Sequence, residues 1–509
     1  MVQTRSTTHR QTTMLHRFFD AAEKYPTQIA VKDSQKQVNY RDLQSWVINI
    51  ANVLRTRNVS PGDRVAVELP PSTELIAALF AIQYVGAAYV PIDPKAPHER
   101  NQIILDDANP ALIISDIHST CHHGYKTDNI HSMLYDSPGK LIHNESTLQG
   151  IAYVIYTSGT TGRPKGVPIT HDNLLALFNA TETFYHFHEK DTVLLYHSYA
   201  FDFSVWEIWS ALAYGGRLLI PDEETRVTPA KLTKLIKDEY VTLLNQTPTA
   251  FSVNAKWLCQ LKPCDLSLRF IIFGGERLNF QILKNWHQHF GLTSPLLVNM
   301  YGITETTIHA SWHVINENDL KFSESNIGKV LPGFDYIIQP FNNNEINDNS
   351  GELLLSGAQV TIGYLNINNK SSEKFIWLEQ NGVSQRYYRT GDVVQHNTHG
   401  ELVYLGRCDQ QVKINGYRIE TGEIESVLAQ YEGIDDISVI ASHSDIYGHQ
   451  LICFFTSSTS PEETIEKLKC LARDTLPIYM RPIRYRKLDI MPKTVNGKVD
   501  KRNIIKSLE

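Results

Sequence analysis

The chain lacks several features that mark specialised classes of protein. Its six cysteines form no C-x-x-C pair, and a chain of 509 residues needs no disulfides to hold its core, so we expect reduced thiols. Residues 1–17 contain no apolar run of signal-peptide length, which argues against secretion and makes the cytoplasm the expected location. The most apolar stretch, 194–220, contains three charged residues and is expected to be buried core rather than a membrane span.

The chain also lacks an excess of positive charge. Its 48 Lys and Arg against 55 Asp and Glu give a net charge of −7, which argues against non-specific binding of nucleic acid. Hydrophobic residues make up 42% and charged residues 20%, values close to the average for globular proteins, so extended disorder is not expected. The length predicts roughly three compact units, at about 100–200 residues for each domain.

The order of apolar patterns predicts an α/β protein in which the arrangement of strands and helices changes along the chain. Strand-like and helix-like segments alternate in the first 300 or so residues, which predicts parallel sheets with crossover helices. Short segments with Gly and Asn turns then predict a small antiparallel sheet or barrel, and a compact domain of about 100 residues follows. The expected strands are 29–31, 65–67, 152–156, 268–273, 351–357, 363–365, 387–390, 401–406, 411–414, 437–440 and 451–456; the expected helices are 40–57, 74–85, 229–239, 422–430 and 461–475.

The sharpest local motif is the sequence YTSGTTGRPKG at 156–166, which directly follows an apolar strand. Glycines allow close backbone approach, hydroxyl and amide groups donate to phosphate oxygens, and a lysine supplies charge. A Walker A loop is excluded because Arg and Pro stand where Gly and Lys would be required. A flexible linker is the alternative, but it would need neither the strand nor the lysine. The candidate phosphate-binding residues are Thr157, Ser158, Gly159, Thr160, Thr161, Gly162 and Lys165.

With this loop, the chain resembles the adenylate-forming superfamily, and specifically the amino-acid adenylation domains of nonribosomal peptide synthesis. The other shared segments occur in the family's order: GAAYVPID at 86–93, FDFS at 201–204, NMYGITE at 299–305, GEL at 351–353, YRTGD at 388–392, GRCD at 406–409 and NGK at 496–498. The resemblance covers nearly the whole chain. It implies a large N-terminal domain, 1–408, of two doubly wound α/β subdomains and a small β-barrel subdomain. A small, mobile α+β domain, 409–509, would follow across a hinge at Asp409.

The resemblance also implies an ATP and Mg²⁺ site. Tyr301 would stack on adenine, Asn299 would read its amino group, and Asp392 would hold the ribose hydroxyls. In isolation, a Thr-Glu helix cap or an aspartate turn would explain these short motifs equally well. The remaining implied contacts are Thr304 on the α-phosphate, Glu305 on Mg²⁺, and Tyr404 and Arg407 lining the nucleotide site. Ile303 stands where the family usually has proline.

Two positions of the last hundred residues match functional positions of the family. Taken alone, Lys498 would be a solvated lysine after an Asn-Gly turn, but the resemblance makes it the adenylation lysine that bridges the substrate carboxylate and the α-phosphate. Gly416 matches the turn that, after domain rotation, lies beside the pantetheine tunnel. The family usually has Arg and Leu where this chain has Asn415 and Thr421.

The resemblance predicts the substrate through a set of pocket positions. Asp202 matches the aspartate that binds the ammonium of an α-amino acid. The set resembles the pocket associated with L-threonine, in which apolar side chains surround a methyl group while Asn245 and His309 contact a hydroxyl. Serine is the nearest competitor, since a methyl group discriminates by only about 1–3 kcal/mol. The pocket positions are Asp202, Phe203, Trp206, Asn245, Ile272, Gly274, Met300, Ile308 and His309, together with Lys498.

No Gly-x-Asp-Ser carrier signal follows Lys498, so we expect a free-standing enzyme that loads the phosphopantetheine thiol of a separate carrier protein. A basic cluster at Arg481, Arg484, Arg486 and Lys487 is a candidate docking site, and an ordinary solvated strand explains it equally well. The need for a small activator protein stays open. The alternatives are an acyl-CoA or aryl-acid ligase, a D-alanine–carrier ligase, and an inactive homologue acting as a scaffold. Asp202 weighs against the first of these, and the hydrophilic pocket against the D-alanine ligase.

Overall fold

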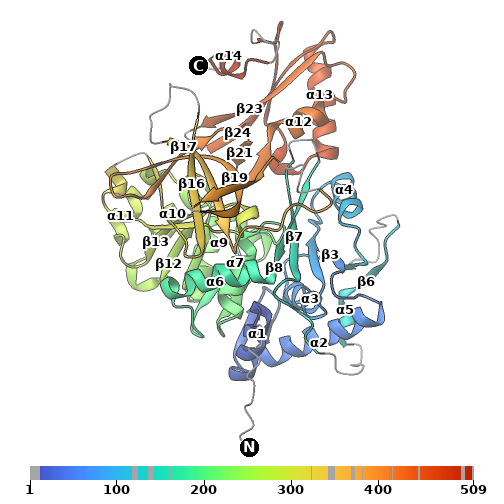
Figure 1. Ribbon diagram of the computed structural model, residues 1–509, viewed down its shortest axis with the longest axis vertical. Helices are drawn as coiled ribbons and strands as arrows, with labels where there is room; N and C mark the ends of the chain where they lie inside the picture. The colour runs from blue at the N-terminus through green and yellow to red at the C-terminus, as the bar shows by residue number, and fades with distance from the viewer. Residues whose placement is uncertain are drawn as a thin grey trace, which may run out of the picture.

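The computed structural model describes residues 12–116, 124–135, 143–159, 163–321, 324–341, 350–367, 373–380, 382–409, 411–414, 416–444, 448–493 and 499–506. It shows a large body, blue through yellow to light orange, beneath a smaller domain in deeper orange and red (Figure 1). No helix within these ranges is long and apolar enough to cross a membrane. The apolar stretch 194–220 lies in the core as predicted, with β9 (Thr192–Leu194), α7 (Phe203–Leu212) and β10 (Arg217–Leu219).

The first sheet of the large body is mostly parallel, as the alternating pattern predicts. Its order is β6 (Thr127–Asn129), β5 (Leu112–Ser115), β3 (Arg64–Glu68), β4 (Ala88–Pro91), β7 (Ile151–Thr157) and the antiparallel β8 (Lys165–Thr170). The accompanying helices are α2 (Tyr40–Thr56), α3 (Thr73–Tyr84), α4 (His98–Ala108) and α5 (Ile130–Tyr135). The helices predicted at 40–57 and 74–85 are therefore confirmed to within a residue or two at each end.

The second sheet begins as a parallel sheet that contains the substrate-side positions. Its order is β2 (Gln37–Asn39), β1 (Ile29–Lys32), β10, β9, β11 (Leu243–Gln246), β12 (Phe270–Phe273) and β13 (Leu296–Tyr301). The helices of this part are α1 (Met14–Lys24), α6 (His171–Tyr185), α7, α8 (Glu223–Val227), α9 (Pro229–Asp238), α10 (Pro248–Leu258) and α11 (Lys284–Phe290). All neighbours from β1 through β13 along this path pair in parallel, so their carboxyl ends meet at one edge.

The antiparallel strands expected after about residue 328 are present, and they continue the second sheet rather than standing apart. From β13 the order runs through β14 (Ser311–Val314), β15 (Ser325–Val330), β20 (Leu402–Arg407), β19 (Val383–His396), β17 (Ser350–Gly357) and β16 (Phe334–Pro340), with β18 (Phe375–Gln380) on β19. Among the described residues, these strand pairings form an open sheet that does not close on itself. The strand predicted at 363–365 is wrong, because that segment turns across β8, where the Leu365 amide donates to the Gly166 carbonyl at 2.8 Å.

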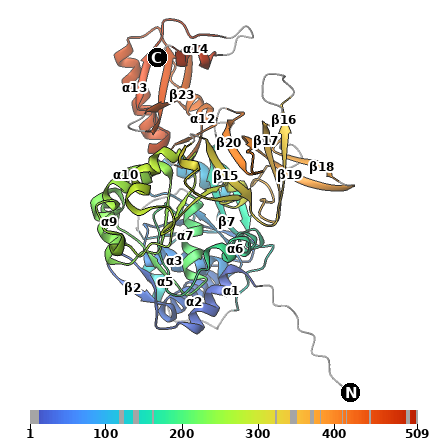
Figure 2. The ribbon, with the colours of Figure 1, turned by 90° about the vertical axis from the view of Figure 1, so that its left-hand side faces the viewer.

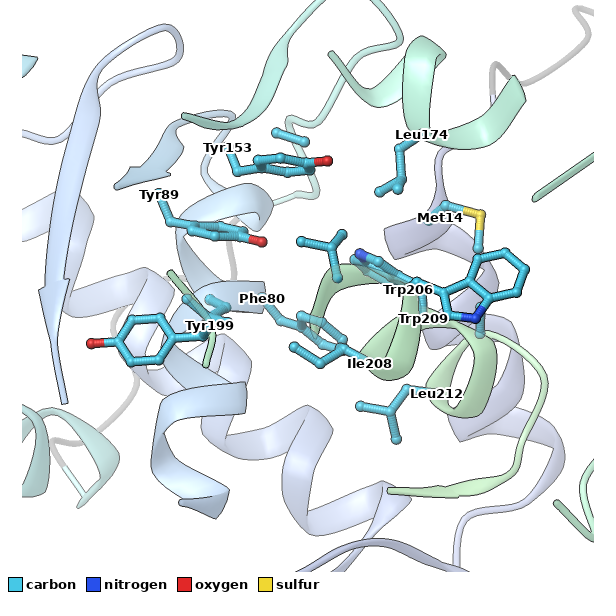
Figure 3. Packing of buried hydrophobic residues seen from close by; sticks show 14 of the residues in the cluster. Met14, Phe80, Tyr89, Tyr153, Leu174, Tyr199, Trp206, Ile208, Trp209 and Leu212 are labelled. Atoms are coloured by element: carbon cyan, nitrogen blue, oxygen red, sulfur yellow. The ribbon is translucent and has the colours of Figure 1, made fainter. Parts of the chain in front are cut away.

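Aromatic side chains fill the core between the two sheets. Phe80 of α3 stacks on Trp209 of α7 with ring centroids 4.5 Å apart, and Tyr89 stacks on Tyr153 at 5.6 Å (Figure 3). The Tyr199 hydroxyl is held by three backbone groups in β3 or just after β3 and β4, including the Ile92 carbonyl at 2.7 Å. Burial of such large rings removes much apolar surface from water, and this fixes α7, whose first turn begins at the substrate side.

The small domain has its own core, and the elements predicted for it occur in the predicted order, together with two strands and a last helix that the sequence pattern did not predict. It contains β21 (Gln411–Ile414), β22 (Tyr417–Glu420), α12 (Thr421–Leu428), β23 (Asp436–Ser444), β24 (Gly448–Thr456), α13 (Pro461–Thr475), β25 (Arg484–Lys487) and α14 (Lys501–Lys506). Strands β23, β24 and β25 form one sheet, whose core includes Val439, Cys453 and Leu468. In both views this domain stands above the large body (Figure 1 and Figure 2). The turn between β21 and β22 contacts the large body, where Gly416 lies against Thr247 and Phe201.

Candidate functional site

The predicted site residues gather in a cleft between the large body and the small domain. The carboxyl ends of β11, β12 and β13 open toward it, where open α/β sheets bind ligands. The cleft is lined from the large body by Thr157, Ser158, Phe201, Asp202, Phe203, Gly302, Thr304, Ile308 and His309, and from the small domain by Lys413, Gly416, Tyr417 and Arg418. Segments more than 250 residues apart in sequence therefore share one site.

The phosphate-loop motif follows β7, as predicted. The Ser158 hydroxyl donates to the Arg418 carbonyl at 2.6 Å and accepts from the Glu420 amide at 3.2 Å. The Gly159 amide donates to the Glu423 carboxylate at 3.2 Å. Lys165, the first residue of β8, lies with its Nζ 5.7 Å from the centroid of the Tyr364 ring. Thr160, Thr161 and Gly162 lie outside the described residues.

Glu305 is buried in the turn after β13, in the 3₁₀ segment η3 (Thr304–Thr306), with 2% of its surface exposed. It accepts hydrogen bonds from the Tyr364 and Tyr388 hydroxyls at 2.8 and 2.9 Å and pairs with Arg418 at 2.9 Å. Burial opposes ionisation, but Arg418 and the Tyr364 hydroxyl together hold the pKa of Glu305 below its ordinary value. An ionised carboxylate is thus maintained inside the protein.

This single carboxylate suits Mg²⁺ better than a metal with an all-protein ligand set. No group of three or more His, Cys, Asp or Glu side chains that could hold a metal occurs among the described residues. Mg²⁺ commonly binds through one or two carboxylates and completes its shell with waters and substrate phosphates. Glu305 lies close to the candidate phosphate loop that follows β7, and it therefore fits that mode of binding.

The residue predicted to hold the ribose lies in a buried cluster of polar side chains. Asp392 on β19 is fully buried, accepts from the Tyr301 hydroxyl at 2.6 Å, and accepts from Arg407 at 2.8 Å. Arg407 also holds both carboxylate oxygens of Asp409, at 2.7 and 2.6 Å. One guanidinium thus joins the predicted ribose carboxylate to the predicted hinge residue.

A smaller pocket beside this cluster contains the residues predicted for adenine. Asn299, Tyr301 and Tyr404 line it together with Lys413 of the small domain. The Asn299 amide nitrogen donates to the Asn326 carbonyl at 2.7 Å, which fixes the orientation of this amide. Lys413 lies with its Nζ 5.8 Å from the centroid of the Tyr301 ring. The structure therefore brings the adenine and ribose candidates together.

Asp202 precedes α7 at the substrate side of the cleft and has 5% of its surface exposed. Burial raises the pKa of its carboxyl to about 6, and a hydrogen bond with Thr304 partly opposes this shift. A cationic partner would stabilise the ionised form of such a buried carboxylate. Its position beside Thr304 puts it next to the residue predicted to contact the α-phosphate.

The other pocket positions lie in two layers. Phe203, Ile308 and His309 line the open cleft. Behind them, Trp206 donates to the Asn245 amide oxygen at 3.1 Å, and its ring meets that of His309 edge to face at 5.0 Å. A deeper layer is completed by Ile272 next to Asn245 across β11 and β12, by Gly274 against Phe203 and His309, and by Met300, whose sulfur accepts from the Tyr185 hydroxyl.

Two buried polar atoms of this pocket have no partner among the described residues. They are the amide nitrogen of Asn245 and Nε2 of His309. Burial lowers the pKa of His309 to about 3, so its ring is neutral at physiological pH. Unpaired buried polar atoms cost free energy unless a ligand or water satisfies them.

The turn that presents His309 is strained. Thr307 and Ile308 adopt φ values of +57° and +72°, a region that β-branched residues rarely occupy. The Thr307 hydroxyl donates to the Gln359 carbonyl at 2.6 Å, and the Gln359 amide donates to the His309 carbonyl at 2.9 Å. These bonds hold the strained turn in place, and such strain often accompanies a functional site.

The small domain places its β21–β22 turn in the cleft. Gly416 has a φ of +83°, and a Cβ built on it would lie 2.8 Å from Cγ2 of Thr247 and 3.4 Å from the Phe201 ring. The predicted glycine turn is therefore packed against the substrate side. Lys498 and the Asn-Gly turn predicted before it lie outside the described residues.

The sequence reasoning missed several residues of the cleft. Lys413, Arg418 and Glu423 come from the small domain, and Tyr364 and Tyr388 surround Glu305. The signal for Lys413 and Arg418 was present as charged positions that alternate with apolar ones along β21 and β22. Nothing in the sequence pattern relates Glu423 to the phosphate loop.

Comparison with known proteins agrees with this geometry. The model of the AMP-binding enzyme family matches residues 18–365, and that of the AMP-binding enzyme C-terminal domain matches residues 423–498. A dimodular nonribosomal peptide synthase of Bacillus subtilis (strain 168) is 37% identical over 94% of this chain, which spans 21% of that protein's length. Syringomycin synthase SyrB1 of Pseudomonas syringae pv. syringae is 35% identical, over 96% of this chain and 81% of its own length.

Among solved structures, holo-PA1221, a nonribosomal peptide synthetase protein containing adenylation and PCP domains, superposes with a TM-score of 0.84 at 28% identity. The match covers 98% of this chain and 84% of that one. The family models alone cover most of the sequence, and the fold and the order of elements match as well. The chain therefore belongs to the AMP-binding enzyme family, as an AMP-forming ligase of the nonribosomal peptide synthetase adenylation type.

Proposed function

We propose that this enzyme activates L-threonine with ATP to threonyl-AMP and passes the threonyl group to the phosphopantetheine thiol of a carrier protein. The observation that carries the choice of amino acid is a pair of polar atoms, on Asn245 and His309, that have no partner in the part of the chain that the structure describes; the same pocket holds Asp202. A small amino acid with a β-hydroxyl satisfies all three groups.

The hydroxyl fits these atoms by its hydrogen-bonding capacity. Because Trp206 donates to the amide oxygen of Asn245, the amide nitrogen is the group left to donate. A neutral His309 whose proton is on Nδ1 offers Nε2 as an acceptor. A hydroxyl both accepts and donates, so it satisfies the two together, whereas valine and 2-aminobutyrate satisfy neither. Serine offers the same hydroxyl without the methyl, and its exclusion depends on the apolar side chains alone.

The first half-reaction joins the carboxylate oxygen of the amino acid to the α-phosphorus of ATP, and the bond from that phosphorus to the bridging oxygen of pyrophosphate breaks. Positioning and electrostatic stabilisation supply most of the catalysis in such transfers. Mg²⁺ bound at Glu305 would neutralise charge on the phosphates. Asp202 holds the ammonium, Thr304 contacts the α-phosphate, and Asp392 orients the ribose. Lys498 is proposed as the cation that bridges the carboxylate and the α-phosphate.

In the second half-reaction the carrier's thiolate attacks the acyl carbonyl, and AMP leaves. The packing of Gly416 against Thr247 and Phe201 supports the assignment of the described arrangement to this step, since a glycine there lets the backbone approach the substrate side closely. We propose Asp409 as the hinge, with the large domain over 1–408 and the small domain over 409–509. Arg481 and the basic residues of β25 are proposed as a carrier docking site.

Amino-acid-dependent ATP–pyrophosphate exchange tests the first step. We expect the highest kcat/KM with L-threonine, a lower value with serine, and a much lower one with valine. A preference for valine would contradict the roles of Asn245 and His309, and exchange with acetate or 2,3-dihydroxybenzoate but with no amino acid would contradict that of Asp202. Loading of a phosphopantetheinylated carrier, followed by intact mass, tests the second step.

A further inference from the structure

Behind the pocket that contains the adenine candidates lies a row of polar side chains that neither half-reaction uses. It begins at Asn299 and passes through Asn326 of β15 and Glu401, the residue before β20, to His313 of β14. Asn299, Asn326 and His313 are buried, with 2%, 8% and 5% of their surface exposed. Buried polar groups cost free energy unless each one has a partner, so their pairing determines how the row is oriented.

The first bond of the row determines which atom of the Asn299 amide is left for a base. Its nitrogen lies 2.7 Å from the backbone carbonyl oxygen of Asn326. Because a carbonyl oxygen only accepts, the NH₂ group of Asn299 must face it, and the amide oxygen is left to accept from a ligand. Adenine carries an amino group at position 6, which donates, whereas guanine carries a carbonyl oxygen there. This orientation of Asn299 therefore favours adenine.

The carbonyl of Asn326 is held in place through the side chain of the same residue. Ser325 and Ile327 line the pocket, and successive side chains of a strand point to opposite faces, so the side chain of Asn326 points away from the pocket. Its amide oxygen accepts from the Gly328 amide at 2.9 Å, and its nitrogen donates to the Glu401 carboxylate at 2.8 Å. Both ends of this side chain are therefore engaged.

Glu401 is held in turn from two directions. Asn397 donates at 3.1 Å to the oxygen that Asn326 contacts, and Nδ1 of His313 lies 3.6 Å from the other oxygen. The His313 ring is held by Asp319, whose carboxylate lies 2.8 Å from Nε2. Burial opposes ionisation of Glu401, but hydrogen bonds from Asn326 and Asn397 hold its pKa below the ordinary value. An ionised carboxylate only accepts, so Asn326 must present its NH₂ group to it.

We propose that Asn326, Glu401 and His313 are positioning residues that select adenine, because they hold the Asn299 amide with its oxygen toward the base. These three side chains do not line the pocket, so they act through Asn299. The proposal rests on the assignment of this pocket to adenine, and it deepens the proposed function by naming what fixes the choice of nucleotide. Without the row, the amide of Asn299 could turn over and present its NH₂ group, which suits a carbonyl oxygen at position 6.

The test measures nucleotide binding by calorimetry in the presence of Mg²⁺ and without an amino acid, so that no adenylation takes place. The probes are ATP, ITP, which has a carbonyl oxygen at position 6, and purine riboside triphosphate, which has no substituent there. The quantity compared between proteins is the ratio of the Kd for purine riboside triphosphate to the Kd for ATP. A general loss of structure weakens both nucleotides and leaves this ratio unchanged, whereas loss of the contact to the amino group lowers it.

The main variant is N326D, which keeps the size of the side chain and sets a carboxylate against that of Glu401. Adding E401Q returns a donor opposite that carboxylate, so the double variant tests rescue. N299A gives the ratio expected when the contact to adenine is lost. N49D is the matched control, because Asn49 of α2 also donates to a backbone carbonyl, that of Leu134 at 2.9 Å, but lines neither pocket of the cleft.

We expect a ratio of about threefold to tenfold in the parent protein, the contribution of one hydrogen bond, and weaker binding of ITP than of either other nucleotide. N299A and N326D should bring the ratio close to one, and N326D should also narrow the difference between ATP and ITP. N326D with E401Q should recover most of the parent ratio. N49D should lower thermal stability and keep the parent ratio.

A parent ratio retained by N326D would overturn the proposal, and so would a ratio for N49D as low as that for N326D, or no recovery with E401Q. If N326D fails to fold, E401A decides in the same way, since the Glu401 side chain is 24% exposed and its removal is better tolerated. A wrong assignment of the pocket would appear differently, because N299A would then also keep the parent ratio, and both ideas would fall. A wrong amino acid would change the exchange results and none of the nucleotide ratios.

Discussion

The packing of Gly416 makes a sharp prediction about transfer to the carrier. In the described arrangement, an alanine Cβ at this position would lie 2.8 Å from Cγ2 of Thr247, closer than van der Waals contact. Thr247 has little freedom to retreat, because its hydroxyl caps α10 by accepting from the Ala250 amide at 3.2 Å. Relief of the clash therefore breaks the cap, at a cost of about 1 kcal/mol.

The cost of breaking the cap arises only in the arrangement in which the turn between β21 and β22 lies against Thr247. G416A should therefore lower the ratio of carrier loading to ATP–pyrophosphate exchange by at least about fivefold, the equivalent of about 1 kcal/mol. T247S keeps the capping hydroxyl and removes the methyl group, so G416A with T247S should recover most of the ratio. Both activities are measured on the same preparations, with loading followed by intact mass of the carrier.

A second glycine serves as a control that distinguishes the effect of backbone strain from the effect of the steric clash. Gly382 has a φ of +77°, close to that of Gly416, but nothing lies within 4 Å of a Cβ built on it. Alanine at either position costs about 1–2 kcal/mol of backbone strain, so G382A should reduce thermal stability and leave the loading-to-exchange ratio unchanged. The reasoning is refuted if T247S gives no recovery, or if G382A lowers the ratio as much as G416A.

Three further predictions concern the substrate pocket. Because the pKa of Asp202 is raised to about 6, the carboxyl loses its charge as pH falls, and the KM for threonine should rise about fourfold from pH 8 to pH 5.5; exchange kinetics across this range test it, and D202N should show a high KM without the rise. A Cβ on Gly274 would lie 3.1 Å from the Phe203 ring, so G274A should raise the KM for threonine more than that for serine, and an equal change for both would mean that Gly274 does not border the methyl group. H309L should lower the ratio of kcat/KM for threonine to that for valine by roughly tenfold or more, because it removes a hydrogen bond to the substrate hydroxyl. An unchanged ratio would show that His309 does not bind the hydroxyl.

Local patterns were sufficient to predict most of the elements. The predicted helices at 40–57 and 461–475 match α2 and α13, and the predicted strands at 65–67 and 411–414 lie in β3 and β21. These segments have a clear apolar period or a capping residue, which act over one or two turns. The strand predicted at 363–365 failed because its backbone bonds to β8, a partner distant in sequence that no local pattern reveals.

The sequence by itself determined the class of the chain and which residues are candidates for its chemistry, because motif order and residue type are properties of the linear chain. The phosphate loop, Asp202, Glu305 and Asp392 were all identified in that way. Only the tertiary structure decided which groups meet. It paired Arg418 with Glu305 and Glu423 with Gly159, and it packed Gly416 against Thr247. Those contacts depend on how two separately packed domains rest on one another, and the free energy that selects such an arrangement comes from burial and charge pairing between distant segments.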